Sequence, residues 1–174
     1  MQENVYHGTS VGRAKKIKQA GRYYHSDGSK EWLGEGAYFF IDRNAFENAC
    51  KWIKYKVQKD ITYSQGAVLI NEMNVEEENL VDLNNPEWQE VFQEYTKMYI
   101  EKHEKEGFSI SAEALELDCS VLNDMCKELG SKAVKQQRYI KAISDTGARS
   151  HIPNCTIISV RDDSILKICS YERV

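Results

Sequence analysis

The chain has 174 residues, of which 41% are hydrophobic, 10% aromatic and 29% charged, with only two prolines and ten glycines. This composition is typical of a folded domain and excludes a collagen-like or a disordered chain. A chain of this length buries about 70% of the surface that its unfolded form exposes, so one core suffices without disulfides or metal. We therefore predict a single domain over residues 1–174.

Charge is divided unevenly along the chain. The whole carries −4, but residues 71–130 hold 16 acidic and 4 basic side chains, a net of −12, whereas the other residues hold 11 and 19, a net of +8. Acidic runs of this kind are typical of solvated helical faces. The positive remainder would raise the local concentration of a polyanionic ligand.

The expected compartment and redox state follow from the polarity of the first residues, the lack of a long apolar stretch and the spacing of the cysteines. The first residues are polar where a secretory signal needs an apolar run, and no stretch approaches the roughly 20 apolar residues of a membrane span. The sequence therefore predicts a cytoplasmic protein with no membrane partner. Five cysteines without a Cys-x-x-Cys pair indicate reduced, mostly buried thiols rather than a disulfide framework or a zinc site.

The first part of the chain predicts alternating strands and helices. The elements are a strand at 4–7, a helix at 11–20, a loop at 22–35, a strand at 36–41 and a helix from 45 to beyond 53. Gly21 stops the first helix, and Trp32 and Leu33 attach the loop to the body. Asp42 is placed to cap the second helix.

The remainder predicts an acidic helical pair between strands. The elements are a central strand at 67–75 with a short continuation at 79–83, helices at 86–106 and 111–129, and strands at 132–134, 139–143, 156–161 and 165–169. Pro86 suits the first turn of a helix. Ser111 is the expected cap of the second acidic helix, and Gly130 ends it. The mixed order predicts an α+β fold.

Three short segments carry the candidate chemistry. His7 ends a strand and Gly8 follows it, so the imidazole can lie over a cleft while the glycine backbone approaches a ligand. Alone, a strand-end histidine is more often a structural hydrogen-bonding group. The segment Gly34-Glu35-Gly36-Ala37-Tyr38-Phe39 leads two glycines into an aromatic strand, which alone is typical of a turn with core aromatics. The late strand at 156–161 signals nothing by itself.

Together and in this order, these segments resemble the ADP-ribosyltransferases of the poly(ADP-ribose) polymerase and diphtheria-toxin type. That family has a His-Gly-(Ser/Thr) strand end, a Gly-x-Gly-hydrophobic-Tyr-Phe strand, and a late strand with a Glu that Gln or a hydrophobic residue replaces in some branches. The matches here are His7-Gly8-Thr9, Gly34 to Phe39, and Ile157 at the third position. The likeness covers residues 4–56, is weaker over 67–83 and 155–169, and is absent from the acidic helices.

The resemblance implies a split antiparallel sheet with an acidic helical insertion at about 85–130, NAD as co-substrate and no metal. His7 would bond the adenosine-side ribose, the main chain of Gly8 would bond the nicotinamide carboxamide, and Tyr38 would stack on the nicotinamide ring. The same site would include Thr9, Gly36 and Ala37. NAD held folded in this way orients its glycosidic bond, so that nicotinamide leaves and an acceptor attacks the open face.

One departure from the family pattern concerns catalysis. Ile157 cannot bond the nicotinamide ribose or stabilise positive charge, and in the family a hydrophobic residue there accompanies transfer of a single ADP-ribose or no activity. Glu35 or Glu72 could supply the carboxylate, although each is simpler as a solvated charge. The family's second stacking aromatic is also unmatched, and Trp52 could substitute for it.

The remaining polar candidates are weaker. His25, His103 and His151 have no partner at metal-ligand spacing. Cys155 follows His151 by four residues, so the two could in principle act as nucleophile and base.

The leading hypothesis is an NAD-dependent mono-ADP-ribosyltransferase that modifies a macromolecule. The acceptor is a nucleic acid or a protein; basic residues in the positive portion favour phosphates: Lys15, Lys16, Lys18, Arg22, Lys51, Lys54, Lys56 and Lys59. By analogy of fold and size, a stand-alone toxin or defence effector is expected, with an inhibitory protein partner on the acidic helices. Two alternatives are an inactive module that binds NAD, ADP-ribose or a partner, and an RNA 2′-phosphotransferase.

Overall fold

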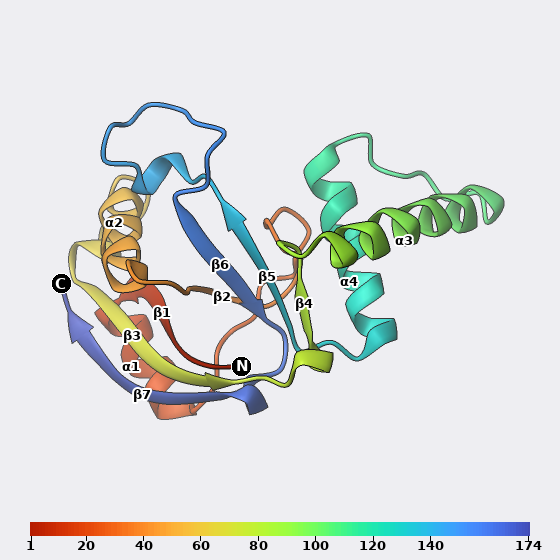
Figure 1. Cartoon of the computed structure of the whole chain (residues 1–174). Coiled ribbons are helices and arrows are strands. Elements are labelled where there is room, and N and C mark those ends of the chain that lie inside the picture. The colour runs from red at the N-terminus through yellow and green to blue at the C-terminus, as the bar shows by residue number, and fades with distance from the viewer.

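The backbone is organised around one seven-stranded sheet in a computed structural model that describes residues 1–174 (Figure 1). The strands are β1 (Gln2–Ser10), β2 (Ala37–Phe40), β3 (Gly66–Asn74), β4 (Leu80–Asp82), β5 (Ala133–Arg138), β6 (Cys155–Val160) and β7 (Leu166–Arg173). Their order across the sheet is β4-β5-β6-β2-β1-β3-β7. Every pairing is antiparallel except that of β4 with β5, which confirms the α+β class.

Four helices flank the sheet. They are α1 (Val11–Ala20), α2 (Ala45–Val57), α3 (Pro86–Lys105) and α4 (Ala114–Leu129), with short 3₁₀ turns η1 (Ile61–Ser64), η2 (Glu77–Asn79), η3 (Lys141–Ile143) and η4 (Asp163–Ile165). The Ser10 hydroxyl accepts from the N–H of Arg13 at the start of α1, and Gly21 ends that helix in the left-handed conformation. Gly130 ends α4 in the same way.

The sheet has a separate apolar core on each face. Val5, Phe39 and Ile158 point toward α1 and pack in a cluster of 17 buried residues. Their neighbours Phe40 and Ile157 point the other way, into a cluster of 16 buried residues that includes side chains of α2 and α4. Alternation along the central strands therefore fills both layers, and each large side chain that is fully buried contributes about 1.5–3 kcal/mol.

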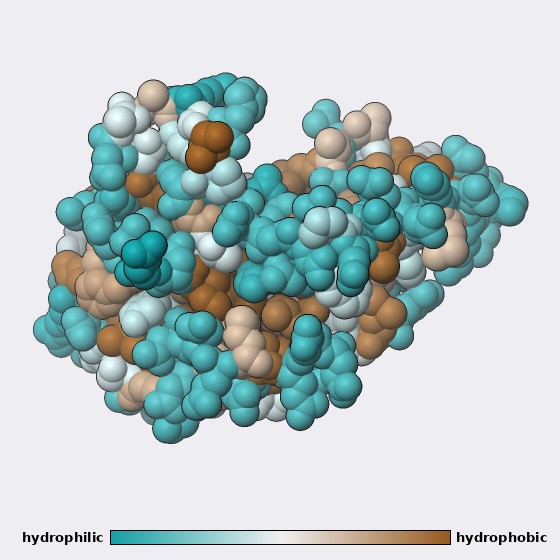
Figure 2. Space-filling model, in the orientation of Figure 1, coloured by the Kyte–Doolittle hydropathy of each residue, from teal (hydrophilic) through white to brown (hydrophobic).

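The predicted acidic insertion is a hairpin of α3 and α4 beside the β4 edge (Figure 1). It joins β4 to β5, and a parallel pair needs such a long crossover. Leu122, Met125 and Cys126 anchor α4 in the core, whereas α3 has no fully buried residue. Hydrophilic residues cover most of the face in view, including the outer end of α3 (Figure 2).

Two strand predictions were wrong. Residues 79–83 do not continue β3: after the η2 turn, Leu80–Asp82 cross to the opposite edge of the sheet and pair with β5. Residues 139–143 form a turn that contains η3, because Asn154 holds both main-chain groups of Ile140 where a strand partner would be needed.

The predicted capping roles of Asp42 and Ser111 were also wrong. Glu113, not Ser111, occupies the N-cap of α4. Asn44 occupies the N-cap of α2 and makes no side-chain cap bond. The Asp42 carboxylate instead accepts the N–H of Asn44 at 2.8 Å and that of Thr156 at 3.0 Å. It therefore ties the end of β2 to the start of β6.

All five thiols are free, and three of them, Cys119, Cys126 and Cys155, are buried, as the prediction of mostly buried thiols requires. Among the helices, none combines the length and the apolar character needed to cross a membrane.

Candidate functional site

The candidate site lies where β1 and β2 separate. These strands share one residue pair, Tyr6 with Phe40, although β1 pairs with β3 along its whole length from Gln2 to Ser10. Beyond the Tyr6–Phe40 pair a cavity of about 360 Å³ opens, within the range of small-molecule sites. Side chains from β1, β2, β6, α2 and the 22–36 loop line it, among them His7, Tyr38, Trp32, Trp52 and Ile157.

His7 bridges the gap between the two strands. Its Nδ1 lies 2.8 Å from the main-chain oxygen of Tyr38, so Nδ1 carries the proton and donates it. Burial lowers the pKa of His7, against the opposing effect of that hydrogen bond, and favours the neutral ring. The rings of Tyr23 and Phe39 pack against the imidazole, with their centroids 5.3 and 5.7 Å from its centroid. The hydrogen bond of Nδ1 is the one that the ring makes within the chain, so the unprotonated Nε2 can accept a hydrogen bond from a ligand in the cavity.

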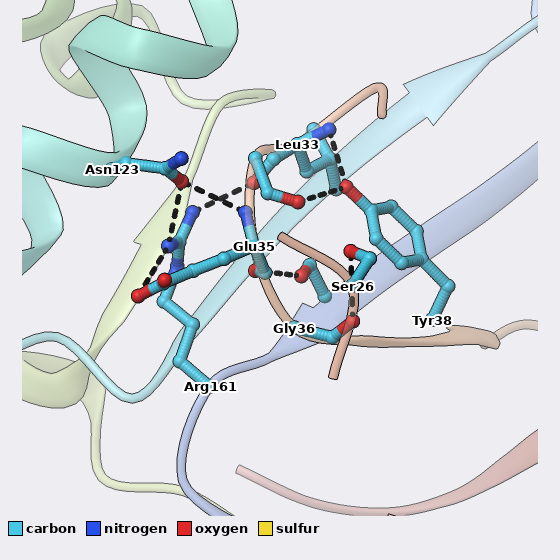
Figure 3. Close-up of polar contacts among 9 residues, drawn as sticks. Ser26, Leu33, Glu35, Gly36, Tyr38, Asn123 and Arg161 are labelled. Atoms are coloured by element: carbon cyan, nitrogen blue, oxygen red, sulfur yellow. Dashed lines mark hydrogen bonds and ion pairs between the residues drawn. The ribbon is translucent and has the colours of Figure 1, made fainter. Parts of the chain in front are cut away.

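Tyr38 is fixed through its phenol group. The hydroxyl donates to the carbonyl of Gly34 at 2.6 Å and accepts the N–H of Leu33 at 2.8 Å (Figure 3). Burial raises the pKa of Tyr38 well above its usual value, so the hydroxyl remains a donor. The ring is thereby held against the cavity wall, while its oxygen closes the 33–34 turn.

Arg161 fastens the same turn from the end of β6. Its side chain is 6% exposed, and its guanidinium donates to the carbonyl of Leu33 at 2.7 Å and to the amide oxygen of Asn123 at 3.1 Å. That amide oxygen also accepts the N–H of Glu35, and Ser159 donates to the Glu35 carbonyl at 2.7 Å (Figure 3). The loop that precedes β2 is therefore held by both α4 and β6.

Two motif glycines are required by close packing. A Cβ on Gly34, which has a φ of 74°, would lie 2.1 Å from the Asn123 amide oxygen. A Cβ on Gly8 would lie 2.6 Å from the main-chain oxygen of Ala49 on α2. The backbone of α2 at Ala49 is thus packed closely over β1.

Most of the predicted site residues meet at this cavity. It is lined by His7, Gly8, Gly36, Ala37, Tyr38 and Ile157. Thr9 is buried but does not line the cavity. Ile157, opposite Phe40 in the β2–β6 register, is 2% exposed and presents only its alkyl chain.

The carboxylates suggested from the sequence lie outside the cavity. Glu35 faces Arg161 at 3.6 Å, and Glu72 pairs with Lys167 at 2.8 Å on neighbouring strands β3 and β7. Glu31 lines the cavity instead. Trp52 does line it, with its ring 6.0 Å from that of Trp32.

Several lining residues were missed by sequence reasoning. Lys30 is one of them, whereas Lys56 is among the basic residues expected from the sequence to favour phosphates. Both bring positive charge to the rim; Lys30 lies 3.4 Å from Glu116, and the Lys56 ammonium lies 4.9 Å from the Trp52 ring centroid. The net charge of the positive portion was their signal, but no motif marked the individual positions.

The other histidines and Cys155 form no second site. His25 pairs with Asp163 at 2.8 Å, and His103 stacks on Tyr99. Burial raises the pKa of Cys155 to about 12, which keeps the thiol protonated at neutral pH. Burial of Cys155 thus disfavours the thiolate that a nucleophile requires, and no three His, Cys, Asp or Glu side chains are grouped to hold a metal ion.

Comparison with known proteins gives little functional information. The chain is 30% identical over 125 residues to an uncharacterized protein of Methanocaldococcus jannaschii. The match covers 71% of this chain and 51% of that relative, so the chain spans about half the length of the curated relative it matches. No family model and no solved structure matches the chain.

Proposed function

We propose that the protein is an NAD-dependent mono-ADP-ribosyltransferase and that the cavity between β1 and β2 is its NAD site. The observation that carries this proposal is the contact between His7 and Tyr38, which lie 31 residues apart yet share a hydrogen bond and a cavity. Ile157, the third motif position, comes from β6, the strand next to β2. Had the imidazole and the phenol faced different cavities, the proposal would have had no site.

The cavity has groups suited to the nicotinamide half of NAD. Nε2 of His7 can accept a hydrogen bond from a ribose hydroxyl, and the edge of β1 beyond Tyr6 has no partner in β2, so main-chain groups near Gly8 are available for a carboxamide. The fixed ring of Tyr38 offers an aromatic wall, and stacking of this kind is worth about 1 kcal/mol. Lys30 and Lys56 at the rim favour the pyrophosphate.

The proposed reaction is a substitution at the ribose carbon that bears nicotinamide. The glycosidic bond breaks and nicotinamide leaves with the bonding electron pair; an oxygen or nitrogen of the acceptor forms the new bond and loses its proton to solvent. Ile157 offers no carboxylate to the positive charge that develops, so Glu31 is the carboxylate of the cavity that can act on it. A hydrophobic residue at position 157 accords with transfer of a single ADP-ribose.

The direct test is release of nicotinamide from NAD. The purified protein should release nicotinamide, and His7→Ala should lower the rate tenfold or more, which is about 1.4 kcal/mol of lost transition-state stabilisation. His151→Ala is the matched control, because His151 is exposed and lies outside the cavity. Equal rates for the two histidine variants, both folded, would remove His7 from the site.

A second candidate is a non-catalytic module that binds NAD or ADP-ribose in the same cavity. The specific observation in its favour is that the third motif position is Ile157 and that Glu35 and Glu72 lie outside the cavity, which leaves Glu31, from the loop before β2, as the carboxylate that lines it. Such a module would bind NAD in calorimetry, with affinity lost in His7→Ala, but would release no nicotinamide.

A further inference from the structure

A strip of aromatic rings interleaved with lysines runs from the cavity along α2. We call it the aromatic–lysine strip, and it comprises Trp32, Trp52, Tyr55, Lys54, Lys56 and Lys59. The Trp52 ring lies 6.0 Å from that of Trp32 and 5.6 Å from that of Tyr55. Trp32, Trp52 and Lys56 line the cavity, whereas Lys54 and Lys59 are exposed. The strip therefore leads from the candidate NAD site onto the surface.

Two of the three lysines of the strip, Lys56 and Lys59, rest on its rings rather than on carboxylates. The ammonium of Lys56 lies 4.9 Å from the ring centroid of Trp52, and that of Lys59 lies 4.9 Å from the ring centroid of Tyr55. Lys51, on the same helix, is by contrast paired with Glu47 and Asp145. Exposed cation–π contacts are weak, so these ammonium groups can turn to a phosphate while the rings remain available.

Flat rings spaced among mobile cations are the combination that binds single-stranded nucleic acids, because bases stack on the rings and phosphates meet the cations. In a duplex the faces of the bases are stacked on one another, so a duplex could bind only through its phosphates and the lysines. The acidic segment, residues 71–130, places its hairpin beside the β4 edge, away from α2 (Figure 1). A polyanion is thus favoured along α2 and disfavoured along the hairpin.

We propose that the aromatic–lysine strip binds a single-stranded nucleic acid and presents one of its nucleotides to the cavity as the acceptor of ADP-ribose. This assignment of the acceptor rests on the proposed function of the cavity. A nucleophilic oxygen or nitrogen of the nucleotide forms the bond to the ribose carbon as nicotinamide departs, and its proton passes to solvent.

Binding is tested without NAD, by fluorescence anisotropy of a labelled oligothymidylate. Tyr55→Leu should weaken binding about tenfold through loss of stacking. Lys54→Gln with Lys59→Gln should make the slope of log affinity against log salt shallower by about 1.4, or 0.7 for each phosphate that is no longer neutralised. The matched control is Lys15→Gln with Lys16→Gln, an equal loss of charge on α1, which covers the other face of the sheet. The inference is overturned if the control weakens binding as much, or if a duplex binds as tightly.

Transfer is tested separately, with NAD labelled in its adenylate half and supplied together with oligothymidylate and nucleic-acid-free cell protein. Label that nuclease removes supports the inference, and label found only in protein overturns it. The strip variants at Tyr55, Lys54 and Lys59 should retain wild-type nicotinamide release in the absence of acceptor, because these side chains do not line the cavity. Oligonucleotide binding without any nicotinamide release would instead reject the function proposed for the cavity.

Discussion

Arg161 donates a 2.7 Å hydrogen bond to the carbonyl of Leu33, which lies 128 residues earlier in the chain. The contact joins the end of β6 to the loop before β2, and the next residue of that loop, Gly34, accepts the Tyr38 phenol. Arg161 is thus a positioning residue: it does not line the cavity, but it holds the turn against which Tyr38 is fixed.

Replacement of Arg161 should loosen this turn. Arg161→Met removes bonds from a charged donor that is 6% exposed, and we expect unfolding by urea to show a loss of about 2–3 kcal/mol. Trp32, next to Leu33, should become more exposed, so its fluorescence should shift to longer wavelength. Arg161→Lys, which keeps the charge, should recover part of the stability and part of the wild-type fluorescence spectrum. Arg149→Met, at an exposed position, should change neither. An unchanged Trp spectrum in a destabilised Arg161→Met would argue against the positioning role.

A comparison of two glycines with the same backbone conformation distinguishes the cost of backbone strain from the cost of a steric clash. Gly34 and Gly107 have φ values of 74° and 76°, but only a Cβ on Gly34 meets other atoms, with the Asn123 amide oxygen at 2.1 Å. Gly107→Ala should cost about 1 kcal/mol, the penalty of the left-handed conformation alone. Gly34→Ala should cost clearly more, because Asn123 must also move. Similar losses in thermal or urea unfolding would show that the loop absorbs the methyl group.

The hydroxyl of Tyr38 should contribute mainly to stability, and its ring mainly to nicotinamide release. Tyr38→Phe keeps the aromatic wall but leaves the Leu33 N–H and the Gly34 carbonyl without their partner, which should cost about 1–3 kcal/mol of stability. Tyr38→Ala also removes stacking and should lower nicotinamide release tenfold or more. Measurement of kcat at saturating NAD should therefore show a larger loss in Tyr38→Ala than in Tyr38→Phe. Equal losses would assign the effect to the hydroxyl.

Burial of neutral His7 predicts a stability that falls in mild acid. Its pKa in the folded protein is lowered from 6.5, so the unfolded chain binds the proton more tightly. The contribution of His7 is therefore fully present above pH 6.5 and decreases as the pH falls from there toward the folded pKa, by at most about 1.4 kcal/mol per unit. Urea unfolding at several pH values should show this loss in the wild type and in His151→Gln, but reduced in His7→Gln. A wild-type curve parallel to that of His7→Gln would contradict it.

The sequence predicted local features better than long-range ones. Helix ends at Gly21 and Gly130, and the acidic helical pair, follow from residues within a few positions of one another. The placement of Leu80–Asp82 at the opposite edge of the sheet depends on β5, more than 50 residues later, which no local pattern specifies. The turn at 139–143 likewise depends on Asn154.

The candidate site shows the same limit. The motifs around His7 and Tyr38 drew attention to two side chains that do share a cavity. Arg161 and Asn123, which hold the intervening loop, come from distant segments with no motif of their own. A sequence motif identifies residues whose type is restricted by the chemistry of the site. It does not identify residues whose role depends on long-range packing.

Ile157 offers a last contrast between stability and chemistry. It is 2% exposed and packs in the core on the α2 face, so Ile157→Ala should cost about 2–5 kcal/mol in urea unfolding. Since its alkyl chain stabilises no charge, nicotinamide release by the folded fraction should fall much less than in Tyr38→Ala. Ile157→Val, which removes a single methyl group, should cost about 0.5–1.5 kcal/mol and leave the rate close to that of the wild type. A rate that collapses in Ile157→Val while the protein remains folded would mean that this side chain positions NAD directly, and the third motif position would then act in binding.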